Sequence, residues 1–385
     1  MSQSRAIPSS AIHRAGFVGA FLRAAEFPPY GAFSTQSAEI APQPYPTAQI
    51  DPIGPSAYCN EVMANGWSID SSYQVDPTKL SNLTNLGVGW TRMTVSQFFD
   101  DLSHIFGSGH YDFTGLDAAQ CQSFTTGNIK PVLGLEAGPV QYNADPPNFT
   151  PVSLPLYKTA ADFGQWCGAV AAHEQQAFPS VTNYSLPGNE VNSNPQLFPG
   201  GQSQIASYSQ ACYAAIKAAN PAAFVYGFEL NMDGSLDAPR FVHQMAQLGC
   251  KVGTCYDALA IHLTLRYPIP PPATPCYPHP GGDYSLRCVN DIQTAASAPI
   301  HILISETVYP VPGFVPDEAT KAKAVVAAFT AFAANPTIDG VSYANVDECA
   351  LYPSGYFFDG CLVDVSGNRL PAYNSLRQLA KARFL

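Results

Sequence analysis

The chain has 385 residues, of which 46% are apolar and only 12% are charged, and its formal net charge is −11. This length and apolar content suffice for one large domain or two average ones. No cluster of Lys and Arg occurs, so the sequence argues against nucleic acid and against an anionic membrane surface as partners. No apolar run reaches the roughly 18 residues that a transmembrane helix needs.

The sequence contains ten cysteines, which is many for an intracellular enzyme. Six of them form pairs close in sequence and are predicted to be local disulfide bridges: Cys250 with Cys255, Cys276 with Cys288, and Cys349 with Cys361. Four remain without a local partner: Cys59, Cys121, Cys167 and Cys212. A zinc site is the alternative, but no CxxC occurs and no His lies at the spacing of a structural zinc site. Disulfides indicate secretion or another oxidising extracytoplasmic compartment.

Residues 1–50 are rich in Ser, Ala and Pro and show no sustained period. We interpret them as a tail or an arm around the domain, or as a processed signal segment. Residues 15–22 (AGFVGAFL) follow Arg14 and resemble a short signal-peptide core, although Arg23 interrupts it and no clean cleavage site follows. Residues 51–385 are then predicted to form a single catalytic domain.

From residue 76 onward, helix and strand patterns alternate. The first helix, 76–87, has Asp76 and Pro77 at its start and Gly87 at its end. The other predicted helices are 114–124, one around 163–171, 205–219, 241–248, 285–297, 321–334 and 371–382. The predicted strands are 88–95, 129–135, 181–186, 223–230, 256–263, 299–305 and 340–346.

One further strand is predicted upstream, within 56–69. Eight strand–helix repeats in one chain predict a (β/α)8 barrel, the TIM barrel of the α/β class. A doubly wound open sheet is the alternative, but no glycine-rich nucleotide-binding motif follows any of the strands. The sequence therefore predicts no nucleotide cofactor, and it offers no other cofactor or metal site.

Two apolar stretches each run into one glutamate. Residues 186–193 (LPGNEVNS) contain Glu190, and residues 302–309 (ILISETVY) contain Glu306. A carboxylate at the end of a buried strand is costly unless it is used. In a barrel these glutamates would follow the fourth and seventh strands and converge at the C-terminal mouth. Two such carboxylates are the machinery of glycoside hydrolysis, although each one alone could be an ordinary surface residue.

Asn189 and Glu190 after the fourth strand, with Glu306 after the seventh, resemble the pattern of the retaining glycoside hydrolases of clan GH-A. The resemblance implies that Glu190 is the acid/base and Glu306 the nucleophile. Arg92 matches the clan's strand-two arginine, which helps to keep the nucleophile ionised. Residues 111–117 (YDFTGLD), followed by IKPVLGL, resemble a stretch of family 39 β-xylosidases.

Four other residues are candidates for contact with a sugar. His262 matches a clan position that lines the pocket, and a core histidine is the alternative. Glu136 departs from the family pattern after strand three and is expected to bind sugar hydroxyls or to pair with Arg92. Tyr309 and Tyr343 are expected to stack on or hydrogen-bond a sugar, with a core position as the alternative; Tyr343 stands where the clan usually has Trp.

The expected substrate is therefore an oligo- or polysaccharide cleaved at a β-glycosidic bond through a covalent glycosyl-enzyme. An inactive carbohydrate-binding barrel, a transglycosylase using the same residues and a metal-dependent barrel hydrolase are the competing functions. The eight histidines do not cluster at strand ends as the last of these would need. The sugar, the linkage and the oligomeric state stay open.

Overall fold

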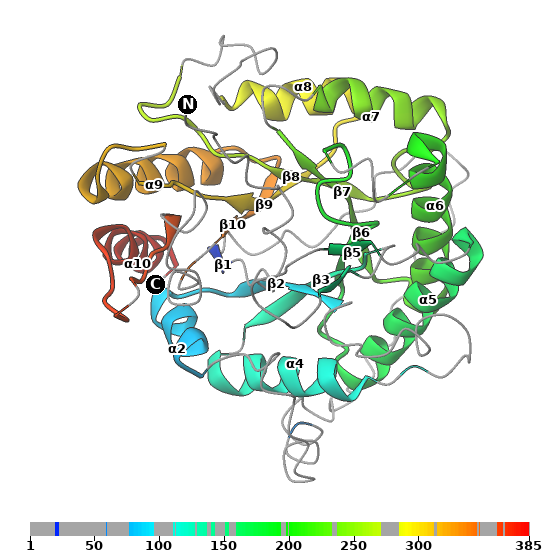
Figure 1. The fold of residues 1–385 in the computed structure, drawn as a ribbon, viewed down its shortest axis with the longest axis horizontal. Helices are drawn as coiled ribbons and strands as arrows, with labels where there is room; N and C mark the ends of the chain where they lie inside the picture. The colour runs from blue at the N-terminus through cyan, green and yellow to red at the C-terminus, as the bar shows by residue number, and fades with distance from the viewer. Residues whose placement is uncertain are drawn as a thin grey trace, which may run out of the picture.

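The structure is a computed structural model in which strands form a ring and helices surround it (Figure 1). The residues it describes are 20–22, 59, 77–95, 111, 113–127, 129–136, 140–142, 151–153, 159–193, 198, 200–232, 237–270, 285–311, 314–344, 346, 360–364 and 366–384.

Eight strands close into a barrel. In order around the ring they are β1 (Ala20–Leu22), β10 (Ile338–Tyr343), β9 (Ile302–Thr307), β8 (Ala258–His262), β7 (Phe224–Asn231), β6 (Asn183–Leu186), β3 (Lys130–Gly134) and β2 (Trp90–Thr94). The seven strands from β2 to β10 in this ring run parallel, and β1 is antiparallel to both of its neighbours. The predicted TIM barrel is confirmed, and its seven predicted parallel strands appear with bounds displaced by a few residues.

Helices cover the outside of the ring (Figure 1). They are α2 (Pro77–Leu86), α4 (Thr114–Gly127), α5 (Ala160–Ala177), α6 (Gly201–Ala219), α7 (Ala238–Gln247), α8 (Arg287–Ala296), α9 (Glu318–Ala333) and α10 (Pro371–Phe384). Side-chain caps fix where several of them begin. Thr159 and Asp162 form a capping box at α5, and Asp237 and Asp317 accept backbone N–H groups at α7 and α9.

A small two-stranded sheet is separate from the barrel sheet. It pairs β4 (Val140–Tyr142) with β5 (Pro151–Ser153) in antiparallel fashion, between β3 and α5. The sequence analysis predicted no strand in this segment.

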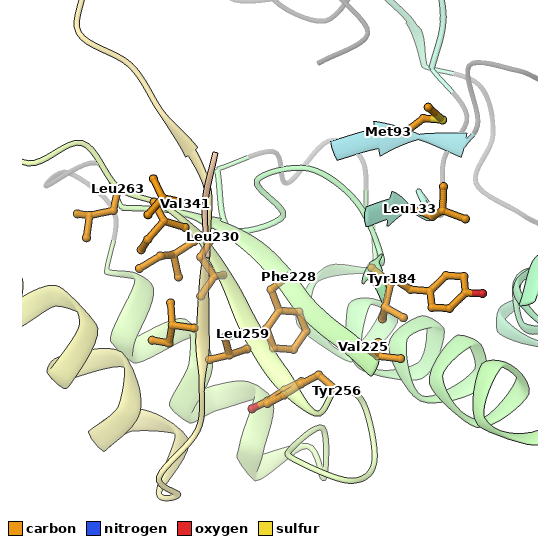
Figure 2. Close-up of a cluster of buried hydrophobic side chains, with 14 of the residues drawn as sticks. Met93, Leu133, Tyr184, Val225, Phe228, Leu230, Tyr256, Leu259, Leu263 and Val341 are labelled. Atoms are coloured by element: carbon orange, nitrogen blue, oxygen red, sulfur yellow. The ribbon is translucent and has the colours of Figure 1, made fainter. Parts of the chain in front are cut away.

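The barrel strands bury side chains on both faces, as parallel sheets do. The outward face packs against the helices and forms the main core, part of which is shown in Figure 2 with Met93, Leu133, Tyr184 and Val225 among its members. A smaller cluster of Val132, Tyr226, Ala258, Ala260 and Leu303 fills the inside of the barrel. The inside is thus a packed core, which leaves the strand ends as the place where a site can form.

The eighth barrel position differs from the prediction. The first strand was expected within 56–69, a range in which the structure describes Cys59 and no other residue. The position between β10 and β2 is taken by Ala20–Leu22, which belongs to the segment predicted to be a tail or arm. Residues from both ends of the chain thus meet at one seam of the barrel.

Three disulfide bridges join described cysteines: Cys59–Cys121, Cys167–Cys212 and Cys250–Cys255. The predicted local bridge between Cys250 and Cys255 is confirmed, and the four cysteines left without a local partner pair with one another. Cys288 and Cys361 are also disulfide-bonded. Their predicted partners, Cys276 and Cys349, lie outside the described residues.

Candidate active site

Glu190 lies in the turn that follows β6 and is held from both its backbone and its side chain. Its backbone is left-handed, with φ at 50°, a conformation that is unusual for glutamate and often marks a functional site. Its N–H donates to the carbonyl of Glu229 at 2.9 Å. One carboxylate oxygen lies 3.0 Å from His262 Nδ1, and the other accepts from Ser193 Oγ at 3.2 Å.

Glu306 lies in β9 and is 8% exposed. Its Oε2 is 3.6 Å from His262 Nδ1 and 3.9 Å from Arg92 Nη1. One histidine nitrogen therefore contacts both glutamates that the sequence analysis singled out. The structure brings Glu190 and Glu306 together at the mouth of the barrel, as expected for residues at the ends of the fourth and seventh barrel strands, with β1 counted as the first.

Arg92, on β2, is buried and ties several elements together. Its Nη2 donates to Asn189 Oδ1 at 2.7 Å, and this bond fixes the side chain of Asn189, the residue before Glu190. Its Nε donates to Glu229 Oε1 at 2.9 Å, and Nη2 also binds Glu229 Oε2. Arg92 thus binds the Glu229 carboxylate through two nitrogens, Nε and Nη2. The Glu306 carboxylate lies farther away, with 3.9 Å between Glu306 Oε2 and Arg92 Nη1.

Glu229, on β7, is a site residue that the sequence analysis missed. It is 2% exposed and accepts a hydrogen bond from Ser185 Oγ at 2.6 Å in addition to those from Arg92. The signal was present in the sequence, because 223–230 (AFVYGFEL) is an apolar strand with a single acid near its end. The same argument identified Glu190 and Glu306.

The two candidate catalytic carboxyls have pKa values displaced in opposite directions. Burial raises the pKa of Glu190, but hydrogen bonds with His262, Asn231 and Ser193 outweigh it, so the pKa is lowered overall. Burial raises the pKa of Glu306 and is the largest cause; the cations His262 and Arg92 oppose it, and the carboxylates Glu190 and Glu229 add to it. Arg92 does favour the ionised form of Glu306, yet the overall pKa of Glu306 is raised.

His262, at the end of β8, is the cation between these two carboxyls. Burial lowers its pKa, but the charges of Glu306 and Glu190 and the hydrogen bond to Glu190 raise it above its usual value. A protonated Nδ1 donates toward both glutamates. Its Nε2 is buried and has no hydrogen-bond partner among the described residues.

Glu136 follows β3 and belongs to the same electrostatic group. Burial raises its pKa to about 7, with the attraction of Arg92 opposing and the charge of Glu229 adding to this shift. The charge of Arg92 acts on Glu136, and the roles expected for Glu136, binding sugar hydroxyls or pairing with Arg92, stay predictions. Near neutral pH its carboxyl exists partly as the acid, which can donate as well as accept a hydrogen bond.

The structure places Tyr309 and Tyr343 in the core, which is the alternative interpretation of these residues. Tyr309 is fully buried and packs edge-on against Phe314 at 5.6 Å between ring centroids. The Tyr343 hydroxyl donates to the Gly360 carbonyl at 2.6 Å. Neither ring is exposed for stacking on a sugar.

Among the described residues, no group of three or more His, Cys, Asp and Glu side chains is arranged to hold a metal ion. None of the helices in the described ranges combines the length and the apolar character needed to cross a bilayer.

No protein-family model matches the chain, and no curated protein matches it in sequence. Solved structures do match it. A family 39 glycoside hydrolase from Bacteroides cellulosilyticus WH2 superposes with a TM-score of 0.57 at 13% identity, over 79% of this chain and 60% of that one. A glucosidase from Croceicoccus marinus gives 0.55 at 13% identity, over 79% and 63%.

Xylanase 10B from Thermotoga maritima gives a TM-score of 0.52 at 14% identity, over 82% of this chain and 92% of the xylanase. The chain therefore spans less than two thirds of the length of the glucosidase and the family 39 enzyme, and nearly all of the xylanase. At such low identity the likeness establishes architecture. The chain has the barrel fold of the family 39 glycoside hydrolases and the xylanases.

Proposed function

We propose that the chain is a retaining glycoside hydrolase that cleaves β-glycosidic bonds of an oligo- or polysaccharide. The observation that carries the proposal is the meeting of Glu190 and Glu306 at one nitrogen, His262 Nδ1, at 3.0 and 3.6 Å. A shared contact of this kind keeps the two carboxyls close. It fits the separation of about 5–5.5 Å found in retaining enzymes better than the ~6.5–9.5 Å of inverting ones.

In this proposal Glu306 is the nucleophile. It attacks the anomeric carbon while Glu190 protonates the departing glycosidic oxygen, and a covalent glycosyl ester forms on Glu306. Glu190 then takes a proton from water, which attacks the same carbon and releases the sugar with its configuration retained. Arg92 orients the Asn189 amide, whose role is to bind the sugar 2-hydroxyl as charge develops on the ring.

In this proposal the proton that the first step needs reaches Glu190 from His262, because the pKa of Glu190 is lowered and that of His262 is raised. His262 Nδ1 lies 3.0 Å from Glu190 Oε1, so the hydrogen bond between them can hold the proton on either partner. When Glu306 becomes an ester, its negative charge disappears from the site. Since a nearby negative charge raises the pKa of a carboxyl, this loss lowers the pKa of Glu190 and prepares it to act as a base.

Glu136 and His262 complete the proposed sugar-binding surface. Both belong to strand ends at the mouth, and Glu136 can exchange hydrogen bonds with hydroxyls in either protonation state. The three disulfide bridges support secretion, since such bonds persist in oxidising compartments. A secreted enzyme would meet polysaccharide outside the cell.

The proposal is tested with a panel of aryl β-glycosides, comparing wild type, Glu306→Ala and Glu190→Ala with and without azide. We expect each variant to lose at least about 10⁴-fold in kcat/KM on the glycoside that wild type cleaves. Azide should restore Glu306→Ala with an α-glycosyl azide as product, and Glu190→Ala with a β-glycosyl azide. The two products distinguish the nucleophile from the acid/base.

Glu318→Ala is the matched control, because the Glu318 carboxylate pairs with Lys321 and not with the site. It should keep wild-type activity. If Glu306→Ala also keeps wild-type activity, or if wild type cleaves neither the panel nor any of the common plant and microbial polysaccharides, the proposed function is wrong.

A further inference from the structure

Strand β7 contains an irregularity that ends at Glu229. In the pairing of β7 with β8, Gly227 faces Leu259 and Leu230 faces Ile261, so three steps along β7 match two along β8. The extra residue defines a β-bulge. Phe228 and Glu229 within it both have left-handed backbones, with φ at 75° and 41°. Two successive non-glycine residues in this region are rare, and such strain often accompanies function.

The bulge decides which way Glu229 points. Tyr226 faces the inside of the barrel, where it contacts the inner cluster, so a regular strand would turn Phe228 inward and Glu229 outward. Instead the Phe228 ring packs outward against Phe241 of α7 and against Tyr256, at 5.5 and 5.3 Å between centroids. Glu229 consequently points into the barrel, toward Arg92 and Ser185.

The bulge also holds the backbone beside the acid/base candidate. The carbonyl of Glu229 accepts the N–H of Glu190 at 2.9 Å. The carboxylate of Glu229 holds Arg92, which in turn binds Asn189 at 2.7 Å. Glu229 thus reaches the Asn189–Glu190 turn by two separate routes, one through its main chain and one through Arg92.

Glu229 also controls the charge that Glu306 experiences. The charged groups that face Glu306 are His262 from β8, Glu190 from the turn after β6, Arg92 from β2 and Glu229 from β7. The groups that face Arg92 are Glu229, Glu306 and Glu136. Because Glu229 contacts Arg92 directly while Glu306 lies 3.9 Å away, Glu229 neutralises much of the only permanent positive charge among these groups.

We propose that Glu229 is a positioning residue of this active site, which holds Arg92 so that the arginine orients Asn189 and exerts only a limited pull on Glu306. The inference rests on the proposed function for the reaction that it serves. A buried ion pair that served stability alone would need no strained bulge, since well-packed apolar residues are often at least as stabilising. The bulge instead turns an acid inward at the cost of an unfavourable backbone.

The first test replaces the charge and keeps the shape, with Glu229→Gln. The free positive charge of Arg92 then acts on Glu306, so the acidic limb of the kcat/KM profile should move to lower pH by about one unit. The titration midpoint of the Glu306 carboxyl, followed by NMR of protein labelled with ¹³C in the glutamate carboxyls and assigned with Glu306→Gln, should fall by the same amount. The NMR measurement does not require catalysis.

Two further variants separate charge from position. Ser185→Ala removes a hydrogen-bond donor to Glu229 but no charge, so the Glu306 midpoint should stay at its wild-type value. Glu229→Asp keeps the charge but withdraws the carboxylate from Arg92, so kcat/KM should fall by about 10²-fold, while the Glu306 midpoint should fall less than in Glu229→Gln. If Glu229→Gln fails to fold, kcat/KM of the Asp variant still tests the positioning role.

The outcomes separate this inference from the proposed function. If wild type cleaves no glycoside but the Glu306 midpoint falls in Glu229→Gln, the proposed function is wrong and the electrostatic role of Glu229 stands. If wild type is active and the midpoint does not move in a folded Glu229→Gln, the positioning role is wrong. Wild-type kcat/KM in Glu229→Asp would overturn it as well.

Discussion

Four glutamates and two cationic side chains share the mouth of the barrel, and the protonation of each depends on the others. Arg92 and His262 face Glu136, Glu190, Glu229 and Glu306, so the acids outnumber the cations. Part of this excess is relieved by protonation, as the raised pKa values of Glu136 and Glu306 indicate. A bound cationic group, or the loss of one carboxylate charge on formation of an ester, would redistribute the protons of the whole group.

A second histidine–carboxylate pair lies at the opposite, N-terminal end of the strands, where it joins β9 to β10. His301 Nδ1, just before β9, is 2.6 Å from Asp339 Oδ1 on β10, and Asp339 Oδ2 accepts from the Tyr226 hydroxyl at 3.2 Å. The hydrogen bond to Asp339 raises the pKa of His301, burial opposes this, and the charge of Asp339 adds to it. Residues at this end of a barrel contribute to stability and not to chemistry.

We predict a pH-dependent effect of His301→Gln on the free energy of unfolding. The folded-state pKa of His301 lies above its unfolded value near 6.5, so the stabilisation is fully present below about pH 6.5 and is lost as pH rises through the folded pKa. The free energy of unfolding is measured in urea at pH 5.5 and at pH 9. The advantage of wild type over the variant should be smaller at pH 9 than at pH 5.5, by at most about 1 kcal/mol, because the pair is partly exposed.

The exposed histidine His243, which contacts Gln247 on its own helix, provides the control. His243→Gln should leave the pH dependence of stability as it is in wild type. A difference between wild type and His301→Gln that is the same at both pH values would contradict the assigned role of the pair.

At this scale the sequence predicted the pair Glu190 and Glu306 because each ends an apolar strand. The single acid in AFVYGFEL was a signal for Glu229, but strand alternation assigns that residue to the outer face, and the bulge that turns it inward is not visible in the sequence. For Tyr309 and Tyr343 the sequence left a core position open beside contact with a sugar, since the position of a tyrosine after a strand does not tell whether later loops cover it. Gly360, which binds Tyr343, comes from such a later segment.

Among the elements, two irregular strands, β7 and β9, place the site residues Glu229 and Glu306. Strand β9 repeats the irregularity of β7: Ile304 pairs with Ile261, and Glu306 pairs with the next residue, His262. Glu229 therefore lies within a shift in register, and Glu306 lies at the end of one. Helix and strand periods predicted which segments are strands, but a shift of one residue depends on tertiary packing and is not visible in the period.

Helices α5 and α6 are joined by Cys167–Cys212 and approach each other closely. A Cβ added to Gly164 of α5 would lie 3.0 Å from the Ala211 carbonyl oxygen of α6, so glycine is needed for this approach. The bridge spans 45 residues of sequence, whereas Cys250–Cys255 spans 5. The pairing of Cys167 with Cys212 was left open by the sequence because neither residue has a near neighbour.

We predict that the long bridge stabilises the fold more than the short one. In the chain-entropy description, the stabilisation grows with the length of the loop that the bridge closes. Cys167→Ala/Cys212→Ala should lower the free energy of unfolding by about 4 kcal/mol, and the control Cys250→Ala/Cys255→Ala by about 2 kcal/mol, measured by urea unfolding. If both variants lose the same free energy of unfolding, or if the control loses more, then local packing and not loop closure determines how much each bridge stabilises the fold.

At the scale of the molecule, the barrel is closed by a strand from the far N-terminal region. Residue pairs Ala20 with Tyr343 and Phe21 with Trp90 join β1 to β10 and β2. Without β1, both of those strands would have an unpaired edge, which proteins normally avoid. The architecture was predictable because seven strand–helix repeats leave one position to fill, but a three-residue antiparallel strand carries too little pattern to be located in advance.

This closure gives the N-terminal segment a structural role that conflicts with its removal as a signal sequence. Residues 15–22 resemble a signal-peptide core, and β1 lies at the end of that stretch. A chain cleaved after residue 22 would lose the strand between β10 and β2. We therefore expect the N-terminus of the mature protein, determined by intact-mass analysis of the protein isolated from its natural source, to lie before Ala20.

The final prediction compares two shortened chains, one beginning at residue 18 and one at residue 24. The first retains β1, and the second exposes the edges of β10 and β2. We expect the second chain to melt at least about 5 °C lower and to associate through these edges, as seen by calorimetry and light scattering. Phe21→Pro in the full chain removes one backbone donor from the middle of β1 and should also lower the melting temperature. Identical melting and light scattering of the two shortened chains would mean that β1 contributes nothing to closure, and the barrel would then have to be stable with seven parallel strands.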